Sequence, residues 1–202
     1  MPSRSCGARA DSTLAAKFQS VSQTTLARLV ILFLNGAFGI GKTAVARALR
    51  RRFPRSLVFD PEKIGGPLQL AARIVGREAD DFQDLRTWRQ LTIVGLRIAR
   101  AVSPTVIVPM AFSDWGYLEE VRSGAEGFDR RVHHFCLIAP LAVVQQRLHA
   151  RGADPVSHPW EYRRAAECCA AHQDQRFVRH IDATAGTPDQ LAAEIANATQ
   201  SS

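Results

Sequence analysis

Cysteine is scarce in this sequence, and long apolar runs are absent from it. The four cysteines among 202 residues show no metal-ligand spacing; Cys168 and Cys169 are adjacent, and Cys136 lies in a strand-like apolar run. These features exclude a disulfide framework and favour reduced thiols, so we expect a cytoplasmic protein. No apolar run approaches the roughly 20 residues that a membrane-spanning helix needs. We therefore expect no transmembrane segment, while peripheral contact with a membrane stays open.

Acidic side chains are nearly missing from residues 1–28, where Asp11 stands beside four basic residues. This stretch also lacks the apolar centre of a secretory signal. We expect a flexible basic N-terminal extension over residues 1–28, followed by one domain over residues 29–202. The whole chain has a formal charge of +7. Its basic residues are dispersed, and a protein that binds an anionic nucleotide shows the same bias, so we expect no nucleic-acid partner.

A glycine-rich stretch between an apolar run and a helix-like segment carries the strongest functional signal. Its spacing, Gly36-x4-Gly41-Lys42-Thr43, matches the phosphate-binding loop G-x-x-x-x-G-K-[ST]. In such loops backbone N–H groups surround the phosphates, the lysine neutralises their charge and the threonine hydroxyl binds Mg²⁺. We therefore expect ATP and Mg²⁺ as cofactors. The expected nucleotide-binding residues are Gly36, Ala37, Phe38, Gly39, Ile40, Gly41, Lys42 and Thr43.

Strand-like and helix-like segments alternate along the chain. The predicted strands are residues 29–34, 56–59, 105–108, 132–138 and 177–181. The predicted helices are residues 42–52, 62–101 with an interruption near Gly76, 114–126, 140–150, 160–175 and 188–198. This alternation predicts an α/β fold, a P-loop NTPase three-layer sandwich with an about five-stranded parallel sheet of nucleotide-kinase type. The irregular stretch at about 151–160 is the expected lid loop.

Signatures of two other P-loop classes are missing. The chain has no Asn-Lys-x-Asp guanine signature. The strand at 105–108 ends in Pro109 and Met110 rather than in the acidic residue that ATP-driven motors usually carry. By analogy of fold, the small size and an arginine-bearing loop late in the chain favour an ATP-dependent small-molecule kinase.

Asp60 has the most informative position of the carboxylates. It follows the second predicted strand, at the sheet edge where ligands of open α/β folds bind. There it could accept the proton of a substrate hydroxyl or hold Mg²⁺ through water. Because Asp before Pro61 is also a favourable helix start, an N-cap role stays open beside the catalytic and metal roles.

Arginines flank the expected lid. Arg147 and Arg151 are four residues apart on one helix face, and Arg163 and Arg164 follow the loop. A closing lid could bring a guanidinium group to the transferring phosphoryl group, whose charge is spread over its oxygens. A solvated basic face is the alternative for each arginine taken alone.

Aromatic and polar side chains in the middle of the chain suit a ligand pocket. The candidates for stacking a planar ring are Phe82, Trp88, Phe112 and Trp115, and those for polar contacts are Lys63, Gln83 and Arg89. Core packing is the commoner role of aromatic residues in helices and stays open for each. His133 and His134 alternate across a predicted strand without a metal-ligand partner in sequence, so we expect structural histidines.

Six ordered motifs together resemble the bacterial tunicamycin-resistance protein family. They are residues 35–43 (NGAFGIGKT), 60–63 (DPEK), 80–83 (DDFQ), 88–89 (WR), 107–110 (IVPM) and 132–135 (VHHF). The resemblance covers about residues 29–182, and the ordered series is far more specific than the P-loop alone. It implies an ATP-dependent protein that counters tunicamycin, a uridine-containing antibiotic with N-acetylglucosamine and a fatty acyl chain. Small antibiotic kinases such as chloramphenicol phosphotransferase are similar in carrying an aspartate after the second strand as base, which supports Asp60.

The resulting hypothesis is ATP-dependent phosphorylation of a tunicamycin sugar hydroxyl. Lys42 and the loop amides would stabilise phosphate charge, while Thr43 and Asp60 would bind Mg²⁺. The expected catalytic residues are Lys42, Asp60, Arg147 and Arg151. The expected substrate contacts are Phe38, Lys63, Phe82, Gln83, Trp88, Arg89, Met110 and Phe112.

Two alternatives use the same loop and pocket. One is an ATP-dependent tunicamycin-binding protein that sequesters the drug without changing it. The other is a nucleoside or nucleotide-sugar kinase with resistance as a side activity.

Overall fold

The computed structural model describes residues 30–63, 65 and 81–200. The extension expected over residues 1–28, and part of the helix expected over 62–101, lie outside the described residues. The elements, in chain order, are β1 (Val30–Gly36), α2 (Lys42–Arg52), β2 (Ser56–Val58), η1 (Phe82–Asp84), α4 (Arg86–Val102), β3 (Thr105–Met110), α5 (Trp115–Glu126), β4 (Val132–Ile138), α6 (Leu141–Ala150), α7 (Pro159–Ala171), η2 (Gln175–Phe177), β5 (His180–Asp182) and α8 (Pro188–Gln200).

Five parallel strands form one sheet in the order β2-β3-β1-β4-β5. The first strand, β1, therefore lies in the centre of the sheet. Near its carboxyl end, Asn35 pairs with Met110 of β3 and with Cys136 of β4. The segments that follow these strands consequently meet at one edge of the sheet, where ligands of such folds bind.

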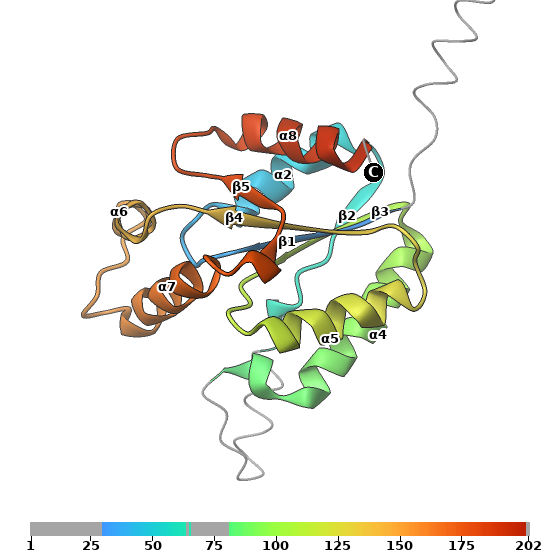
Figure 1. Cartoon of the computed structure of the whole chain (residues 1–202), viewed down its shortest axis with the longest axis horizontal. Helices are drawn as coiled ribbons and strands as arrows, with labels where there is room; N and C mark the ends of the chain where they lie inside the picture. Colours follow the sequence, from blue (N-terminus) through green and yellow to red (C-terminus); the bar gives the residue numbers. More distant parts are fainter. Residues whose placement is uncertain (1–29, 64, 66–80, 201–202) are drawn as a thin grey trace, which may run out of the picture.

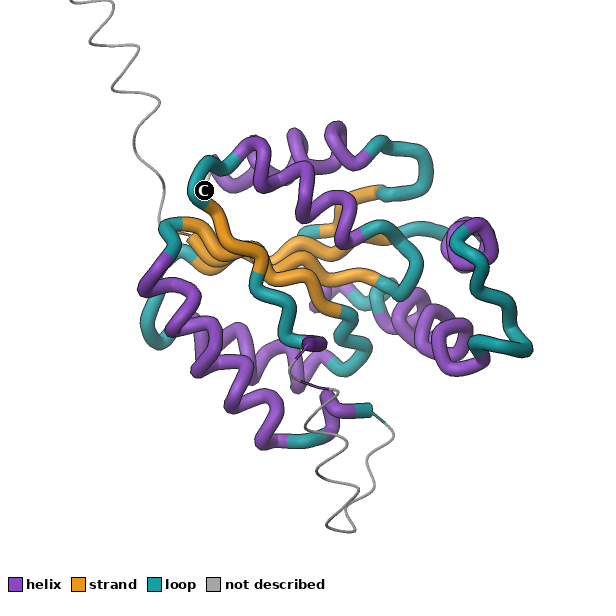
Figure 2. Tube along the Cα trace, turned by 180° about the vertical axis from the view of Figure 1, so that it is seen from behind, coloured by secondary structure: helices purple, strands orange, loops and turns teal. Residues whose placement is uncertain are grey.

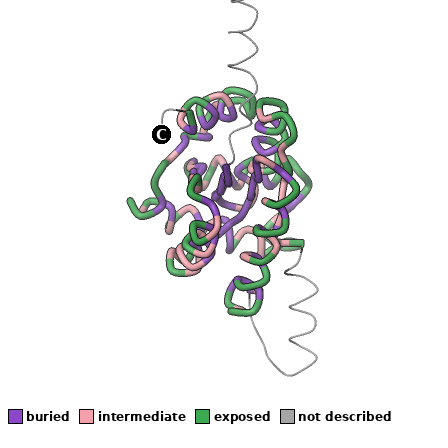
Figure 3. The backbone as a smooth tube through the Cα atoms, turned by 90° about the vertical axis from the view of Figure 1, so that its right-hand side faces the viewer, coloured by how far each residue is buried: buried purple, intermediate pink, exposed green. Residues whose placement is uncertain are grey.

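Helices cover both faces of the sheet. Side chains of a strand alternate between its faces, so Leu32 and Leu34 of β1 pack in the core beneath α2 and α8, while Ile31 and Phe33 pack in the core beneath α4 and α5. Figure 1 shows α2 and α8 over one face and α4 and α5 over the other, and Figure 2 gives the same arrangement from behind. Figure 3 shows buried strands inside partly exposed helices. The predicted three-layer α/β sandwich is confirmed.

Helices α6 and α7 lie beyond the carboxyl end of β4 (Figure 1). They are joined by the irregular stretch that the sequence predicts as a lid. Their buried residues Val144, Leu148, Ala165 and Cys168 join the core on the α2 side of the sheet. None of the described helices is both long and apolar enough to span a lipid bilayer.

The boundaries predicted around the last strand are wrong. The helix expected over residues 160–175 ends at Ala171, and the strand expected over 177–181 is β5, His180–Asp182. The Asp174 side chain accepts a hydrogen bond from Arg176 N and starts the short helix η2 instead. Phe177 then packs its ring against Trp115 and His172, with ring centres 5.5 and 5.0 Å away. A local Asp turn and one buried ring thus override the strand-like pattern.

Candidate active site

The loop between β1 and α2 has the backbone of a phosphate-binding loop. Gly39 and Gly41 have φ angles of 85° and 111°, which side chains rarely tolerate. A Cβ atom on Gly39 would also lie 2.7 Å from the Leu148 side chain of α6. Gly39 is therefore required both by the conformation of the loop and by its packing, and Gly41 by conformation alone.

The amino end of α2 fits an anion. Its N-cap is Gly41, which offers no side-chain cap, and its first turn contains no acidic residue. The free N–H groups and the helix dipole of such a terminus favour bound phosphate. Thr43, in the first turn, is exposed. Its hydroxyl and the nearby carboxylates are the hard oxygen ligands that Mg²⁺ prefers, so the residues present fit Mg²⁺-ATP.

Lys42 folds back over the loop. Its Nζ donates hydrogen bonds to Gly36 O at 2.8 Å and Ala37 O at 3.0 Å. Burial lowers the pKa of its ammonium group, and the neighbouring Glu62 carboxylate opposes this shift. The same Nζ lies 5.2 Å from the Phe38 ring centre, and Phe38 makes an edge contact with Trp160 of α7, with centres 4.9 Å apart. Phe38 thus connects the lysine with α7.

Two carboxylates follow β2 on the same short turn. Asp60 Oδ1 accepts a hydrogen bond from Glu62 N at 3.1 Å, which is the capping role left open by the sequence. The Oε1 atom of Glu62 is buried and has no hydrogen-bond partner among the described residues. Burial raises the pKa of Glu62; nearby Lys42 opposes the shift, and Asp60 and Asp81 add to it. A buried carboxylate beside the P-loop lysine is the arrangement expected of a general base.

Sequence reasoning named Glu62 only as part of a motif and did not place it in the site. The available signal was its spacing, two residues after Asp60. Its burial depends on a distant contact, in which Trp88 Nε1 donates a hydrogen bond to Pro61 O at 3.1 Å. This contact holds the turn that carries Glu62.

The two predicted lid arginines have different surroundings. Arg147 donates to Ile40 O at 3.0 Å, Ala183 O at 2.8 Å and Thr184 O at 3.1 Å, so it fastens α6 to the P-loop and to the segment after β5. Arg151 is exposed and close enough to Lys42 to lower the pKa of that lysine. Of these two arginines, Arg151 therefore stays a candidate for contact with a bound phosphate.

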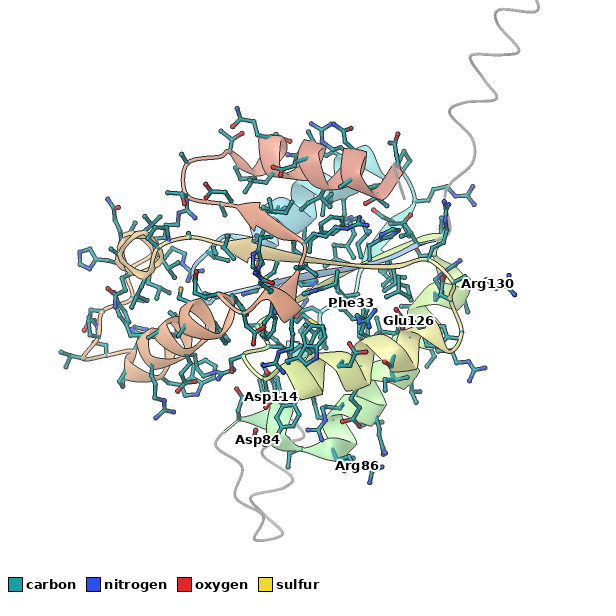
Figure 4. The ribbon with its side chains drawn as sticks, viewed as in Figure 1. Phe33, Asp84, Arg86, Asp114, Glu126 and Arg130 are labelled. Atoms are coloured by element: carbon teal, nitrogen blue, oxygen red, sulfur yellow. The ribbon has the colours of Figure 1, made fainter. Side chains whose placement is uncertain are left out.

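A polar cleft of about 380 Å³ is connected to the P-loop by Trp160, a lining residue that contacts Phe38. Three parts of the chain line it: the η1 segment, the residues after β3, and α7. The lining residues are Asp81, Gln83, Asp84, Ser113, Asp114, Tyr117, Trp160, Arg163, Arg164 and Glu167. In Figure 4, Asp84 and Asp114 lie near each other at one end of the α4 and α5 pair, whereas Glu126 and Arg130 lie at the other.

Arg164 holds the cleft together. Its Nη1 donates to Ser113 Oγ at 3.0 Å and to Glu167 Oε2 at 2.6 Å, and its Nη2 lies 3.1 Å from Asp81 Oδ2. Nη2 also donates to Ala111 O at 3.3 Å. Burial raises the pKa of Asp81, while Gln83 N and Arg164 oppose the shift. The three linings of the cleft are thus tied to one buried guanidinium group.

Several predicted substrate contacts lie in the core instead of the cleft. Trp88, Met110 and Phe112 are buried, with exposed fractions of 1%, 1% and 0%. Phe82 packs on Trp88 with ring centres 5.0 Å apart. Arg89 is held by Glu120 Oε2 at 2.6 Å and by Gln83 O. These side chains therefore pack behind the cleft instead of lining it. For the aromatic rings, burial of a large apolar surface favours this position.

The remaining predicted contacts lie at the cleft or beside the loops of the site, and Gln83 is itself buried, with an exposed fraction of 4%. Gln83 lines the cleft and donates to Ala111 O at 3.2 Å. Phe38 contacts Trp160, which lines the cleft. Lys63 is exposed beside the Asp60 turn. Of the predicted set, these three remain candidates for contact with a substrate.

Asn35 and His172 fix the segment that forms the cleft floor. Asn35 accepts from Phe112 N at 2.9 Å and donates to Phe112 O at 3.1 Å. His172 Nε2 donates to the same carbonyl at 2.7 Å, and burial lowers the pKa of His172 to about 4. The histidine is therefore neutral near pH 7 and acts as a structural donor.

This loop, sheet order and carboxylate pair define a P-loop protein with the fold of small-molecule kinases. A family model described as an AAA domain matches residues 31–177. The solved tunicamycin resistance protein of Deinococcus radiodurans is 31% identical, with a TM-score of 0.66, and the alignment covers 85% of this chain and 96% of that one. The chain therefore belongs to this AAA-domain family and, within it, to the bacterial tunicamycin-resistance proteins.

Two further solved structures share the fold. A gluconokinase from Sinorhizobium meliloti 1021 is 17% identical with a TM-score of 0.62, and covers 86% of this chain and 96% of its own. A shikimate kinase from Acinetobacter baumannii, in complex with shikimate, is 17% identical with a TM-score of 0.58, and covers 87% and 96%. No curated protein sequence gives a significant match.

Proposed function

We propose that this protein is a cytoplasmic, ATP-dependent phosphotransferase that phosphorylates a sugar hydroxyl of tunicamycin and so confers resistance to it. The observation that carries the proposal is the buried, unpartnered carboxylate oxygen of Glu62 beside the P-loop lysine. A protein that only binds nucleotide and drug has no need of a base at that point. The likeness to a tunicamycin resistance protein supports the choice of acceptor.

In the proposed reaction the acceptor hydroxyl oxygen forms a bond to the γ-phosphorus of ATP as the bond to the β,γ-bridging oxygen breaks. The hydroxyl proton passes to the Glu62 carboxylate, and the products are the phosphorylated acceptor and ADP. The P-loop amides, Lys42 and Arg151 stabilise the charge on the phosphoryl oxygens. Thr43 and Asp60 would hold Mg²⁺, which when bound neutralises phosphate charge.

Asp60 and Glu62 thereby divide the tasks that the sequence assigned to Asp60 alone. One Asp60 oxygen is already bonded to the Glu62 amide, which leaves the other for a metal-bound water. Glu62 keeps an unbonded oxygen for the proton.

Mass analysis of tunicamycin after incubation with the protein and Mg²⁺-ATP tests the proposal. We expect the drug to gain one phosphoryl group and ATP to become ADP in equal amount. Lys42→Ala serves as the inactive control. Unmodified tunicamycin at full occupancy of the protein would reject the proposal and leave sequestration as the function.

A further inference from the structure

The cleft walls carry more negative than positive charge. Four carboxylates line the cleft, Asp81, Asp84, Asp114 and Glu167, against the two guanidinium groups of Arg163 and Arg164. Arg164 is neutralised by Asp81 at 3.1 Å and Glu167 at 2.6 Å. Arg163 lies 3.8 Å from Glu167. Both cations are therefore engaged by the walls themselves.

Asp84 and Asp114 are the carboxylates of the cleft without an ion pair, although Arg176 lies close enough to Asp114 for a weak electrostatic attraction. Both are exposed to the cleft, and neither forms an ion pair with any of the described residues. Asp114 Oδ1 accepts from Tyr117 N at 3.0 Å, which fixes its carboxylate at the start of α5. Because like charges repel, these two carboxylates would disfavour a ligand in the cleft that carries a carboxylate or phosphate group.

The polar groups of the cleft suit a hydroxylated ligand. Carboxylates accept strong hydrogen bonds from hydroxyl groups. Arg164, whose side chain is only 10% exposed, contributes an Nε donor that is buried without a partner among the described residues. An acceptor oxygen that reaches this donor would satisfy it, and a neutral hydroxyl, amide or carbonyl would do so without bringing charge.

Aromatic side chains and volume set the size of the ligand. Trp160 and Tyr117 line the cleft and offer apolar ring faces. A volume of about 380 Å³ lies at the lower end of small-molecule sites and suits one or two rings.

We infer that this cleft receives a neutral, polyhydroxylated ring and selects against acceptors that carry a carboxylate or phosphate. The inference rests on the proposed function in taking the cleft as the acceptor site. It adds the charge class of the acceptor and identifies Asp84 and Asp114 as the residues that set it.

A binding comparison tests the inference. The protein is saturated with Mg²⁺ and a non-hydrolysable ATP analogue, so that added phosphate groups cannot occupy the P-loop. It is then titrated with uridine and with uridine 5′-monophosphate and followed by NMR. We expect uridine to bind at least tenfold more tightly, and the difference to shrink at high salt. Equal or tighter binding of the phosphate form, or no binding of uridine, would overturn the inference.

The double variant Asp84→Asn, Asp114→Asn tests whether these two carboxylates cause the selectivity. Asparagine keeps the cap of α5, so the variant is expected to fold. We expect its affinity for uridine 5′-monophosphate, relative to its affinity for uridine, to rise about tenfold per carboxylate removed, because asparagine keeps an acceptor oxygen but carries no charge. Glu194→Gln, an exposed charge on α8, is the matched control. An unchanged affinity ratio in the double variant would also overturn the inference.

The outcomes separate the two proposals. Selective binding without any phosphorylation of tunicamycin rejects the proposed function and keeps the inference. Phosphorylation of tunicamycin together with equal binding of uridine and uridine 5′-monophosphate keeps the proposed function and rejects the inference.

Discussion

Among single side chains, Glu62 carries the sharpest consequence for activity. As the general base it must be deprotonated, so kcat/KM is expected to rise with pH through its pKa. Burial raises that pKa above the ordinary value, so the acid limb of the pH profile should lie above that of an unperturbed glutamate. Glu62→Gln should lower kcat about 10²- to 10⁴-fold and remove this limb, while ATP affinity stays nearly unchanged.

The same substitution should stabilise the protein. A carboxyl group whose pKa is raised on folding stabilises the folded state below its unfolded pKa, and this contribution is lost as pH rises through the folded pKa. At neutral pH the buried carboxylate of Glu62 therefore destabilises the fold, and Glu62→Gln should raise Tm. Kinetics and thermal unfolding of the variant, beside Glu194→Gln, check both effects. Full activity in Glu62→Gln would remove Glu62 from the catalytic role.

Single residues also show where sequence reasoning succeeds. The P-loop could be predicted because its backbone and its chemistry are encoded in nine consecutive residues. Glu62 could not, because its burial depends on the contact of Trp88 with Pro61. Trp88 and Phe112 were expected to contact the ligand but are buried in the core. A sequence does not show whether an aromatic ring near a site points into the pocket or into the core.

Among helices and loops, α6 is the element most closely connected to the nucleotide site. Arg147 bonds to the P-loop and to the segment after β5, whereas the Arg151 guanidinium makes no hydrogen bond to any described residue. Arg147→Ala should lower the free energy of unfolding by about 1–3 kcal/mol because buried carbonyls lose their donor. It should also raise the KM for ATP. Denaturant unfolding and steady-state kinetics measure these changes.

Arg151→Ala is the contrasting variant on the same helix. It should lower kcat about tenfold or more through the loss of positive charge at the phosphoryl group. Its stability should change by less than about 0.5 kcal/mol because the side chain is exposed. Equal losses of stability in both variants would contradict this division of roles.

Element boundaries depend on contacts that a sequence pattern does not contain. Most strands and helices could be predicted because apolar runs alternate with amphipathic segments. The segment at residues 172–179 could not, because Asp174 forms a local turn and Phe177 is buried against α5.

For the molecule as a whole, buried histidines predict loss of stability in mild acid. His134 Nδ1 donates to Val178 O at 2.9 Å, and burial lowers the pKa of His134 to about 4. The unfolded chain takes up the proton near pH 6.5, so the free energy of unfolding should fall between pH 6.5 and 4, by about 3 kcal/mol for this residue. His172 adds to the fall in the same pH range.

Unfolding free energies measured across this pH range test the prediction. His134→Gln should flatten the dependence, whatever its effect on stability at pH 7. His149→Gln, an exposed histidine on α6, should leave the slope unchanged. A slope that His134→Gln does not alter would assign the acid sensitivity to other groups.

The central position of β1 has a consequence for synthesis on the ribosome. β1 and the P-loop precede every other described element, yet both neighbours of β1, β3 and β4, are made later. The Arg147 bridge from the P-loop also needs the carbonyl groups of Ala183 and Thr184. A nascent chain that ends before β5 therefore carries the whole P-loop sequence but lacks two of the three carbonyl groups to which Arg147 donates. We therefore expect full affinity for ATP only after the last strand has been made, although the P-loop is among the first described parts to be translated.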